Sequence, residues 1–586
     1  MLATIYVDST NPYFTSVDGV LYSKDMKTLR LCPPKNCTKF SVPSSVEVIG
    51  DYAFYGHKDG GVNEISFNEG LREIGVRAFY ENYALKTLRF PSSLRKFGEG
   101  SFNCVTSSGA IQSVHFNDGL EVIGDSAFVG AYFKDAFSLP SSVKEIGSYA
   151  FANCTAITKF TFPSSLEVLG DNAFAGATGI LDIDLEAGNT NFVINDNILY
   201  TSDMKKAVMC PSGRRDAVTI PEGVEKIGNY AFYMVDGCQE YNFPSTLKTI
   251  GKQAFAHCYG LREFTIPNTV TSIGENCFDL CENLKTVTIG SGLTEIPSQA
   301  FIECYSLSNI DIPSTIKTIG KQAFLGCTEI KSLDLKEGLK EIGNGAFYFS
   351  TTEYNENDLP GLTSLNIPNS VEYLGDNAFA NQSALTTVSI GSGLTYFGNG
   401  AFNGAPVTSL TISNDNQHFT ADNKIVYSKD KEELYFALTS LSGEVTLPSG
   451  LKVINEYAFE GCKSITAMNF PESLEEIKEG AFVSTKITNL EFKSGLKKIG
   501  DGAFSMGFVK SITFSEGIES IGMSAFSTTD ITELTLPNSL KTLGEGAFSK
   551  CIGLTSLKLG NGLEEIGNHA FYNCKKITGE VKFQHR

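Results

Sequence analysis

One pattern recurs from end to end of this sequence: an aliphatic residue, usually a Gly, two variable residues, Ala-Phe and, in many copies, a Cys three residues after the Phe. Eleven of the nineteen spacings between successive copies are 23 residues and three are 22. A fixed period in this range is typical of a solenoid, in which each repeat forms one coil that packs on its neighbours. The twenty anchoring residues are Phe54, Phe79, Phe102, Phe128, Phe151, Phe174, Phe232, Phe255, Phe278, Phe301, Phe324, Phe347, Phe379, Phe402, Phe459, Phe482, Phe504, Phe526, Phe548 and Phe571.

One repeat unit, Leu284–Cys304 (LKTVTIGSGLTEIPSQAFIEC), shows how a coil can be built. Its segment Thr286–Ile289 alternates polar and aliphatic residues, which predicts a strand with the aliphatic side chains inward. Gly290–Gly292 then breaks the strand, and Leu293 and Ile296 form a second, shorter inward-facing segment. The Gly that usually follows this segment suits a backbone that turns sharply. We expect the Ala-Phe pair to close the coil, with the Phe side chains buried in a continuous stack.

The solenoid interpretation also sets the domain organisation. A globular chain of 586 residues would split into several domains, but a solenoid can grow without limit because each coil is buried only by its neighbours. We therefore predict one solenoid over residues 1–586, of about twenty repeats of 22–26 residues. Both ends have strand-like residues and no visible polar cap, so we expect a piece of a longer protein.

Three longer modules interrupt the period, at about 2–54, 180–232 and 407–459. The middle of each consists of two apolar segments around a polar turn, which predicts a β-hairpin built into the coil. Such a module either spaces the array or carries a binding protrusion. The polar insertion Ser350–Asp358 is expected to be a loop.

Charge and cysteine usage exclude several classes of protein. The net charge of −19 is spread thinly over the chain, which argues against nucleic acid as a partner. No stretch approaches the ~18 apolar residues of a membrane span, and no secretion signal is visible. Eight of the fourteen Cys stand three residues after a repeat Phe, so we expect a buried ladder of reduced thiols, with Cys37 and Cys238 as the most reactive exceptions.

No catalytic pattern is found. The six His are scattered over unrelated positions of the repeat, and neither an HExxH nor a GxSxG motif is present. Paired His and Cys ligands at zinc spacing are also missing. We predict that the chain is not an enzyme and has no catalytic residues, no metal site and no cofactor.

The outward positions of the longer predicted strands offer a binding surface. They are nearly all small and polar, and strands at ~4.8 Å spacing would align them into a flat strip. Strand faces in water also favour Thr and Ser for β-propensity and solubility, so the pattern alone leaves both explanations open. We call these residues the candidate strip: Thr286, Thr288, Asn309, Asp311, Ser332, Asp334, Ser364, Asn366, Thr387 and Ser389.

Units such as Leu284–Cys304 and FTIPNTVTSIGENCFDLC (Phe264–Cys281), together with the LYSKD of Leu21–Asp25, resemble the leucine-rich repeats of BspA-like surface antigens. The resemblance implies an elongated, curved, right-handed solenoid with a parallel sheet of short strands and turns on the opposite side. It also implies a cell-surface or extracellular location and adhesion to host matrix proteins, such as fibronectin and fibrinogen, or to other microbes.

We therefore predict a non-enzymatic cell-surface adhesion protein whose strand face binds an extended protein or a glycan. The alternative is a spacer or scaffold solenoid, part of a larger protein, with no ligand of its own.

Overall fold

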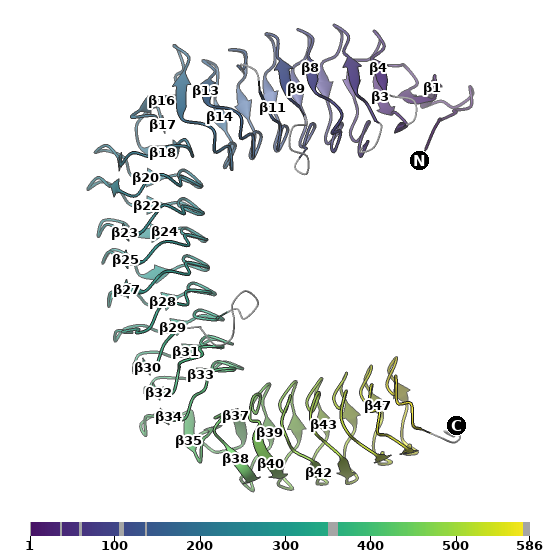
Figure 1. The fold of residues 1–586 in the computed structure, drawn as a ribbon, viewed down its shortest axis with the longest axis vertical. Coiled ribbons are helices and arrows are strands. Elements are labelled where there is room, and N and C mark those ends of the chain that lie inside the picture. The colour runs from purple at the N-terminus through teal and green to yellow at the C-terminus, as the bar shows by residue number, and fades with distance from the viewer. Residues whose placement is uncertain are drawn as a thin grey trace. The chain divides into compact units, whose positions relative to one another are not determined.

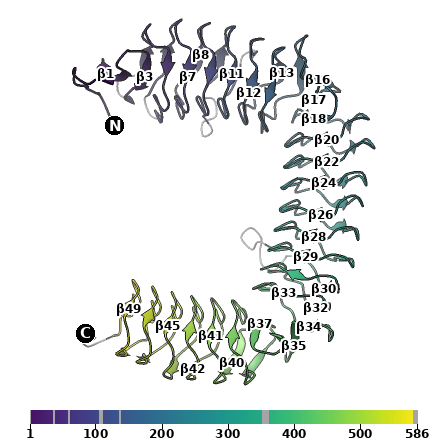
Figure 2. The ribbon, with the colours of Figure 1, turned by 180° about the vertical axis from the view of Figure 1, so that it is seen from behind.

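The computed structural model describes residues 2–34, 38–57, 61–104, 111–134, 138–349 and 361–577, and these form an all-strand solenoid. The chain forms two compact units, residues 1–284 (unit 1) and 285–586 (unit 2). Within each unit, successive coils stack on one another (Figures 1 and 2). No α-helix is present in these ranges. The solenoid predicted from the sequence is confirmed, whereas a single domain over the whole chain stays a prediction.

Most regular coils contribute two strands, and the two belong to different sheets. The first strand lies before the Pro- or Gly-containing break, and the second strand is the residue pair that directly precedes the repeat Gly. Second strands pair in parallel with those of the next coil, as in Glu295↔Thr318 and Ile296↔Ile319. The backbone N–H of Gly320 also donates to the carbonyl of Ile296, at 2.8 Å. The continuous sheets therefore run through the second strands rather than through the longer first strands.

In unit 1 the second strands build one nine-stranded and one six-stranded sheet. The strands of the first are β1 (Phe14–Val17), β2 (Val20–Ser23), β3 (Thr28–Leu31), β5 (Val48–Ile49), β7 (Glu73–Ile74), β9 (Lys96–Phe97), β11 (Val122–Ile123), β12 (Glu145–Ile146) and β14 (Val168–Leu169). Those of the second are β16 (Phe192–Asn195), β17 (Ile198–Thr201), β18 (Lys206–Met209), β20 (Lys226–Ile227), β22 (Thr249–Ile250) and β24 (Ser272–Ile273). The first strands are β4 (Lys39–Ser41), β6 (Glu64–Ser66), β8 (Thr87–Arg89), β10 (Ser113–His115), β13 (Lys159–Phe162), β15 (Asp182–Leu185), β19 (Val218–Thr219), β21 (Tyr241–Asn242) and β23 (Glu263–Thr265).

In unit 2 the second strands build a five-stranded and a nine-stranded sheet. The five strands are β26 (Glu295–Ile296), β28 (Thr318–Ile319), β29 (Glu341–Ile342), β31 (Tyr373–Leu374) and β33 (Tyr396–Phe397). The nine are β35 (Phe419–Asp422), β36 (Ile425–Ser428), β37 (Glu433–Ala437), β39 (Val453–Ile454), β41 (Glu476–Ile477), β43 (Lys498–Ile499), β45 (Ser520–Ile521), β47 (Thr542–Leu543) and β49 (Glu565–Ile566). The first strands are β25 (Thr286–Thr288), β27 (Asn309–Asp311), β30 (Ser364–Ile367), β32 (Thr387–Ile390), β34 (Ser409–Ile412), β38 (Ser442–Thr446), β40 (Ser464–Asn469), β42 (Asn489–Phe492), β44 (Ser511–Phe514), β46 (Glu533–Thr535) and β48 (Ser556–Lys558).

The three long modules place antiparallel strands at the start of a sheet. In each, three strands pair antiparallel in sequence order, and the third then pairs in parallel with the next regular coil: β1–β2–β3, β16–β17–β18 and β35–β36–β37. The hairpin expected from the sequence is thus one part of a three-stranded meander. The predicted loop Ser350–Asp358 lies outside the described residues.

The repeat Phe residues form the centre of the core. Phe301 is completely buried, and its ring stacks on that of Phe324 with 5.3 Å between the centroids and 3° between the planes. Equivalent stacked pairs follow one another from Phe54 to Phe174 and from Phe232 to Phe278 in unit 1. In unit 2 they run from 301 to 402 and from 459 to 571. The predicted burial of the Phe stack is confirmed.

The repeat Gly serves close packing between coils, which corrects the expectation that it serves a sharp turn. A Cβ added at Gly522 would lie 2.7 Å from the carbonyl carbon of Gly500 and 2.7 Å from the backbone nitrogen of Asp501, in the preceding coil. Gly544 would meet Gly522 and Met523 in the same way, at 2.5 Å. Neither glycine has a positive φ. A side chain is excluded here because the backbones of successive coils nearly touch.

The left-handed backbone lies instead two residues before the repeat Phe. At this position φ is between 49° and 62° in all twenty coils, and only six of these residues are Gly. A non-Gly residue in this region is energetically unfavourable, so the fourteen coils without a Gly here each contain a strained turn. The surrounding backbone hydrogen bonds hold the turn in place; Phe54 N–H, for example, donates to the carbonyl of Ala78 in the next coil at 2.8 Å.

The cysteine ladder has a hydrogen-bonding role in addition to its packing role. Six ladder thiols donate to the carbonyl of the repeat Phe in the preceding coil, over 3.0–3.3 Å: Cys154, Cys258, Cys281, Cys327, Cys551 and Cys574. In other coils the same position is Asn82 or Gln382, whose amide donates to the Phe carbonyl at 2.6 Å. In these coils the position therefore holds a side chain that bonds to the preceding coil.

We predict that most ladder thiols resist a bulky maleimide at pH 8 until the chain unfolds. Burial raises the pKa of Cys104 and Cys462 to about 12, so these thiols are both inaccessible and protonated. The neighbouring pair Cys551 and Cys574 is expected to react first, because Cys574 is only half-buried and its hydrogen bond lowers the pKa of Cys551 to about 7. Mass spectrometry of the labelled chain would locate the adducts, with Cys574→Ser as the control.

Three cysteines fall outside this scheme. Cys238 was expected to be reactive from its off-repeat position but is fully buried, and Cys37 lies outside the described residues. Cys32 is disulfide-bonded, so the maleimide cannot label it. Rapid labelling of Cys154 or Cys258 in the folded chain would contradict the prediction that the ladder thiols are inaccessible.

Candidate ligand-binding surface

The candidate strip lies on first strands of unit 2. Eight of its ten residues are in β25, β27, β30 and β32, in register: Thr286↔Asn309 and Thr288↔Asp311 in one pair of strands, Ser364↔Thr387 and Asn366↔Ser389 in the other. Ser332 and Asp334 are exposed but lie outside any strand. The predicted strip is thus formed by two short runs of strands with an irregular segment between them.

All ten side chains are exposed or half-buried, and they alternate with buried neighbours. In β30 the order is exposed Ser364, buried Leu365, exposed Asn366 and buried Ile367. Across strands, the hydroxyl of Ser389 donates to the Oδ1 atom of Asn366 at 2.6 Å. The strip is therefore an accessible polar surface whose side chains are partly ordered by one another.

A surface groove opens where β30, β32 and β34 end. It encloses about 490 Å³ and is lined by two residues of the candidate strip, Asn366 and Ser389. Other polar lining residues, which the candidate strip does not contain, are Glu337, Asn369, Thr411, Ser413 and Asn414. We call this the strand-end groove. Thr411 could have been found from the sequence, because it pairs with Ser389 and continues the same alternation one repeat further on.

Hydrogen bonds within the chain hold one wall of the strand-end groove. The carboxylate of Glu337 accepts hydrogen bonds from the backbone N–H groups of Asn369 and Ser370, both at 3.1 Å. The hydrogen bond from Asn369 is the main cause that lowers the pKa of Glu337 below its ordinary value. Asn369 in turn accepts from the backbone N–H of Ser392 at 3.0 Å. Glu337 therefore stays ionised at neutral pH and fixes the loop that follows β30.

The part of the candidate strip outside the strand-end groove contains charged residues close together. Asp334 and Lys336 form an ion pair, and both side chains are exposed. Asp334, with a smaller contribution from Asp311, raises the pKa of Lys336. Exposed pairs of this kind contribute little to stability, so their charges remain open to a partner.

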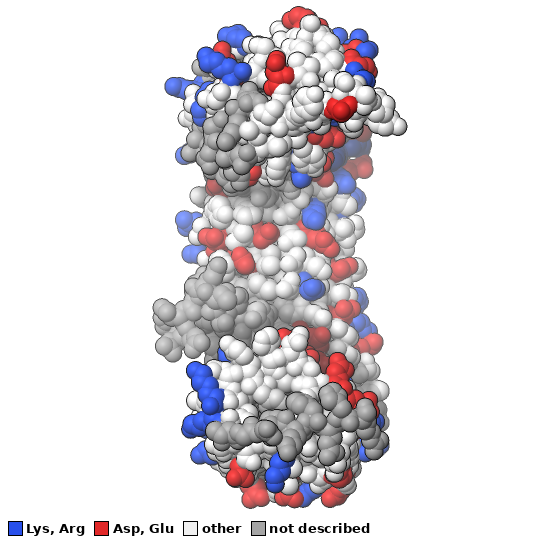
Figure 3. All heavy atoms as spheres, turned by 90° about the vertical axis from the view of Figure 1, so that its right-hand side faces the viewer, with Lys and Arg blue, Asp and Glu red and all other residues white. Residues whose placement is uncertain are grey.

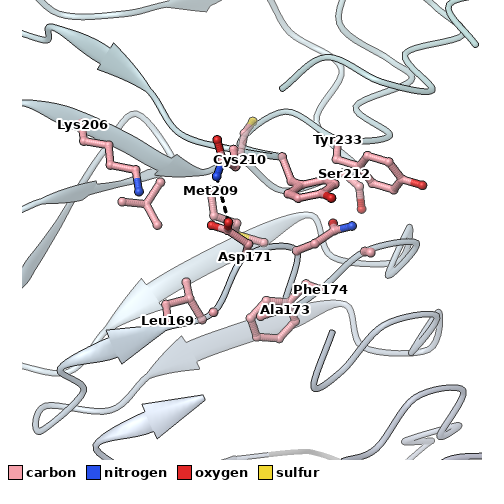
Figure 4. A pocket seen from close by; sticks show the side chains of 15 residues that line it. Leu169, Asp171, Ala173, Phe174, Lys206, Met209, Cys210, Ser212 and Tyr233 are labelled. Carbon is pink, nitrogen blue, oxygen red and sulfur yellow. Dashed lines mark hydrogen bonds between the residues drawn. The ribbon is translucent and has the colours of Figure 1, made fainter. Parts of the chain in front are cut away.

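A second hollow lies in unit 1, between the coil of Phe174 and the second long module (Figure 4). Leu169 and Asp171 line one side, and Met209, Cys210 and Tyr233 line the other. Asn229 Nδ2 donates to Asp171 Oδ2 at 2.9 Å across it. The cavity measures about 40 Å³, which is enough for water-sized groups only. It closes a junction between coils and is too small to hold a substrate.

Figure 3 shows acidic and basic side chains interspersed on the face in view rather than gathered by sign. Over the part of the chain that the structure describes, no cluster of three or more His, Cys, Asp or Glu is placed to hold a metal ion. Among those same residues, no helix meets the length and hydropathy needed to cross a bilayer.

Stacked coils with short parallel strands and an aliphatic and Phe core define a leucine-rich-repeat solenoid. The chain belongs to the BspA-type leucine-rich-repeat family. The family model described as "BspA type Leucine rich repeat region (6 copies)" matches residues 32–111, 103–215, 212–308, 248–360, 357–424, 432–555 and 519–584, which is nearly the whole chain. Solenoids of this family are typically non-enzymatic. A search of curated protein sequences finds no match.

The solved structures similar to this chain include three bacterial proteins. A leucine-rich repeat protein from Eubacterium ventriosum is 22% identical, with a TM-score of 0.51, and the match covers 69% of this chain and 97% of that protein. A leucine rich cell surface protein from Faecalibacterium prausnitzii is 24% identical, with a TM-score of 0.43 and coverages of 65% and 95%. The pneumococcal vaccine antigen PcpA is 22% identical, with a TM-score of 0.36 and coverages of 58% and 83%.

Proposed function

We propose that this chain is a non-enzymatic binding protein of the cell surface that holds an extended protein segment along the candidate strip. The observation that carries the proposal is the strand-end groove, because two of the residues predicted from the sequence line it. Its volume of about 490 Å³ falls within the range of small-ligand sites, about 300–1,000 Å³, and so suits a few residues of a peptide.

The chemistry of the strip favours contacts that are individually weak. Thr, Ser and Asn side chains offer both donors and acceptors, but exposed aromatic and Arg anchors of tight interfaces are absent from the ten residues. Repetition along successive strands can compensate, since linked weak contacts raise the overall affinity. A partner that extends over several coils fits this surface better than a compact one.

The location and the class of partner rest on family membership. Leucine-rich-repeat proteins generally bind proteins, and one related structure is described as a cell surface protein. We extend both properties to this chain as part of the proposal, together with the host matrix proteins that the resemblance suggests. A spacer solenoid with no ligand is the competing function, and a glycan is the competing ligand for the strip.

The test uses the full chain and immobilised fibronectin and fibrinogen, measured by biolayer interferometry. The variant Asn309→Lys/Asp311→Lys/Asp334→Lys changes charge along the strip without altering any buried residue. A second variant, Asn366→Ala/Ser389→Ala/Thr411→Ala, removes polar groups of the strand-end groove. We expect each to weaken binding at least tenfold, because a tenfold loss corresponds to only about 1.4 kcal/mol.

The matched control is Asn489→Ala/Ser511→Ala. Ser511 donates to Asn489 Oδ1 at 2.7 Å, which repeats the Ser389–Asn366 contact outside the strand-end groove. This variant should bind like the unmodified chain. Undiminished binding by both strip variants would move the binding surface elsewhere, and no binding by the unmodified chain would favour the spacer.

A further inference from the structure

The second and third long modules each end at a junction between two regular coils, and the two junctions share one hydrogen bond. In unit 1 Asn229 donates to Asp171 at 2.9 Å, and in unit 2 Asn399 donates to Glu456 at 2.7 Å. All four residues stand three positions before a repeat Phe. In unit 1 the donor is in the later of the two coils, and in unit 2 it is in the earlier one. Because the contact occurs at both junctions, we assign it to the structure of the solenoid itself.

One residue after the repeat Phe, the two junctions differ. Unit 1 has Ala175 and Tyr233 at these positions, whereas unit 2 has Asn403 and Glu460. The amide of Asn403 donates to Glu460 Oε2 at 2.6 Å. The junction in unit 1 is formed without such a pair, so closing the junction does not require it.

The Asn403–Glu460 pair lines a surface groove of about 480 Å³. Its wall consists of the Ala-Phe turns of several coils, and its main side chains are Tyr348, Asn381, Asn403, Tyr457, Glu460 and Lys463. We call it the junction groove. The candidate strip is formed by first strands instead, so the two surfaces use different parts of the coil.

Asn403 contains an acceptor that the chain leaves unused. The residue is only 8% exposed, and its Oδ1 atom has no hydrogen-bond partner in the described part of the chain. Buried polar groups in folded proteins are nearly always paired, so such an acceptor beside a groove points to a donor supplied by a ligand. Glu460 is half-buried, and this burial raises the pKa of its carboxyl group. A ligand hydroxyl would give that carboxylate a further donor.

The other lining groups indicate the class of ligand. Glu460 and Lys463 balance each other in charge, which disfavours phosphates and metal cations. Asn, Glu and Lys side chains supply donors and acceptors in close alternation, and each sugar hydroxyl is both a donor and an acceptor. Tyr348 and Tyr457 add amphipathic rings, against which the C–H face of a pyranose can pack. Tyr457 is held in position by its hydroxyl, which donates to Glu479 Oε1 at 2.7 Å.

We propose that the junction groove binds a neutral saccharide, with Asn403 and Glu460 as its hydrogen-bonding centre. This site goes beyond the proposed function, because it uses turns rather than strands and a saccharide rather than an extended protein. A peptide in the same groove would be a different outcome. A peptide presents one backbone donor and one backbone acceptor per residue at fixed spacing, whereas a saccharide presents clustered hydroxyl groups.

The test probes the full chain on an array of neutral oligosaccharides built from glucose, galactose, mannose and N-acetylglucosamine, beside sialylated and sulfated oligosaccharides. Calorimetry on the best neutral probe then compares variants. We expect Asn403→Ala to weaken binding at least tenfold and Glu460→Gln to weaken it less, because the amide retains an acceptor and adds a donor. Tyr348→Leu should also weaken binding, and it alters neither member of the Asn403–Glu460 pair.

The matched control is Ser505→Ala, at the same turn position outside the junction groove; it should bind normally, as should the Asn366→Ala/Ser389→Ala/Thr411→Ala variant. Equal melting temperatures would show that Asn403→Ala and Tyr348→Leu are folded. The proposal is overturned if no neutral oligosaccharide binds, if only the acidic ones bind, or if the Asn403 and Tyr348 variants both bind undiminished. Loss of saccharide binding with matrix-protein binding retained would separate this site from the candidate strip.

Discussion

Replacing Phe301 with Ala is expected to destabilise the surrounding coils by ~3–5 kcal/mol, the usual cost of removing a large buried aromatic side chain. Phe301 is completely buried, and its ring stacks on that of Phe324 with a centroid distance of 5.3 Å. In a solenoid each coil interacts with its nearest neighbours, so the damage should be local first. Hydrogen exchange measured by mass spectrometry should show faster exchange in the coils around residues 301–324 before the rest of unit 2 responds.

The comparison variant is Phe571→Ala, in the last coil that the structure describes. Phe571 is half-buried, so only part of its apolar surface is returned to water, and we expect a loss of about 1–2 kcal/mol. Unchanged protection around residues 301–324 in the Phe301 variant would contradict the role of the Phe stack. An equal loss in both variants would show that burial does not set the cost.

The fold could be predicted because its determinant is local and repeated. The Phe spacing fixes one coil length, and stacking equal coils brings the Phe side chains together, as the rings of Phe301 and Phe324 show. The outward positions of the first strands were also accessible from the sequence, because alternation along a strand assigns Asn366 and Leu365 to opposite faces.

The location of the continuous sheets could not be predicted in this way. A second strand such as Thr318–Ile319 has two residues, too few to show alternation, and its pairing depends on backbone hydrogen bonds between coils. The role of the repeat Gly was hidden for a similar reason. The atoms that exclude a side chain at Gly522 belong to the preceding coil, so neither the neighbouring sequence nor the local turn reveals them.

The candidate sites were only partly accessible from the sequence. Asn366 and Ser389 could be placed on one surface, but the groove that they line depends on how the ends of three strands are arranged. The Asn403–Glu460 pair was missed altogether. These residues are 57 positions apart and meet because the third long module brings two non-consecutive coils together. A repeat pattern describes equivalent positions within coils and contains no information on such an irregular contact.

Gly522→Ala is expected to lower the free energy of unfolding of unit 2 by about 3 kcal/mol, the upper end of the usual cost of overpacking. The added methyl group would lie 2.7 Å from backbone atoms of Gly500 and Asp501, and backbone cannot swing aside as a flexible side chain can. The two coils must separate, which also lengthens the hydrogen bond from Met523 N–H to Asp501 Oδ1, now 2.7 Å. Urea unfolding followed by circular dichroism would give the loss, and hydrogen exchange would locate it between residues 500 and 523.

Gly502→Ala is the matched control. Gly502 is in the preceding coil, and it adopts a left-handed backbone, whereas Gly522 packs closely against another coil. The φ of Gly502 is +58°, and the nearest atom to an added Cβ is Ser505 Oγ at 3.6 Å, an ordinary contact. Only the cost of a left-handed Ala, about 1–2 kcal/mol, should appear. Tyr457 and Ser524 occupy the same left-handed position in other coils, which shows that the solenoid tolerates a side chain there. If Gly502→Ala cost as much as Gly522→Ala, the short distance between coils would not explain the repeat Gly.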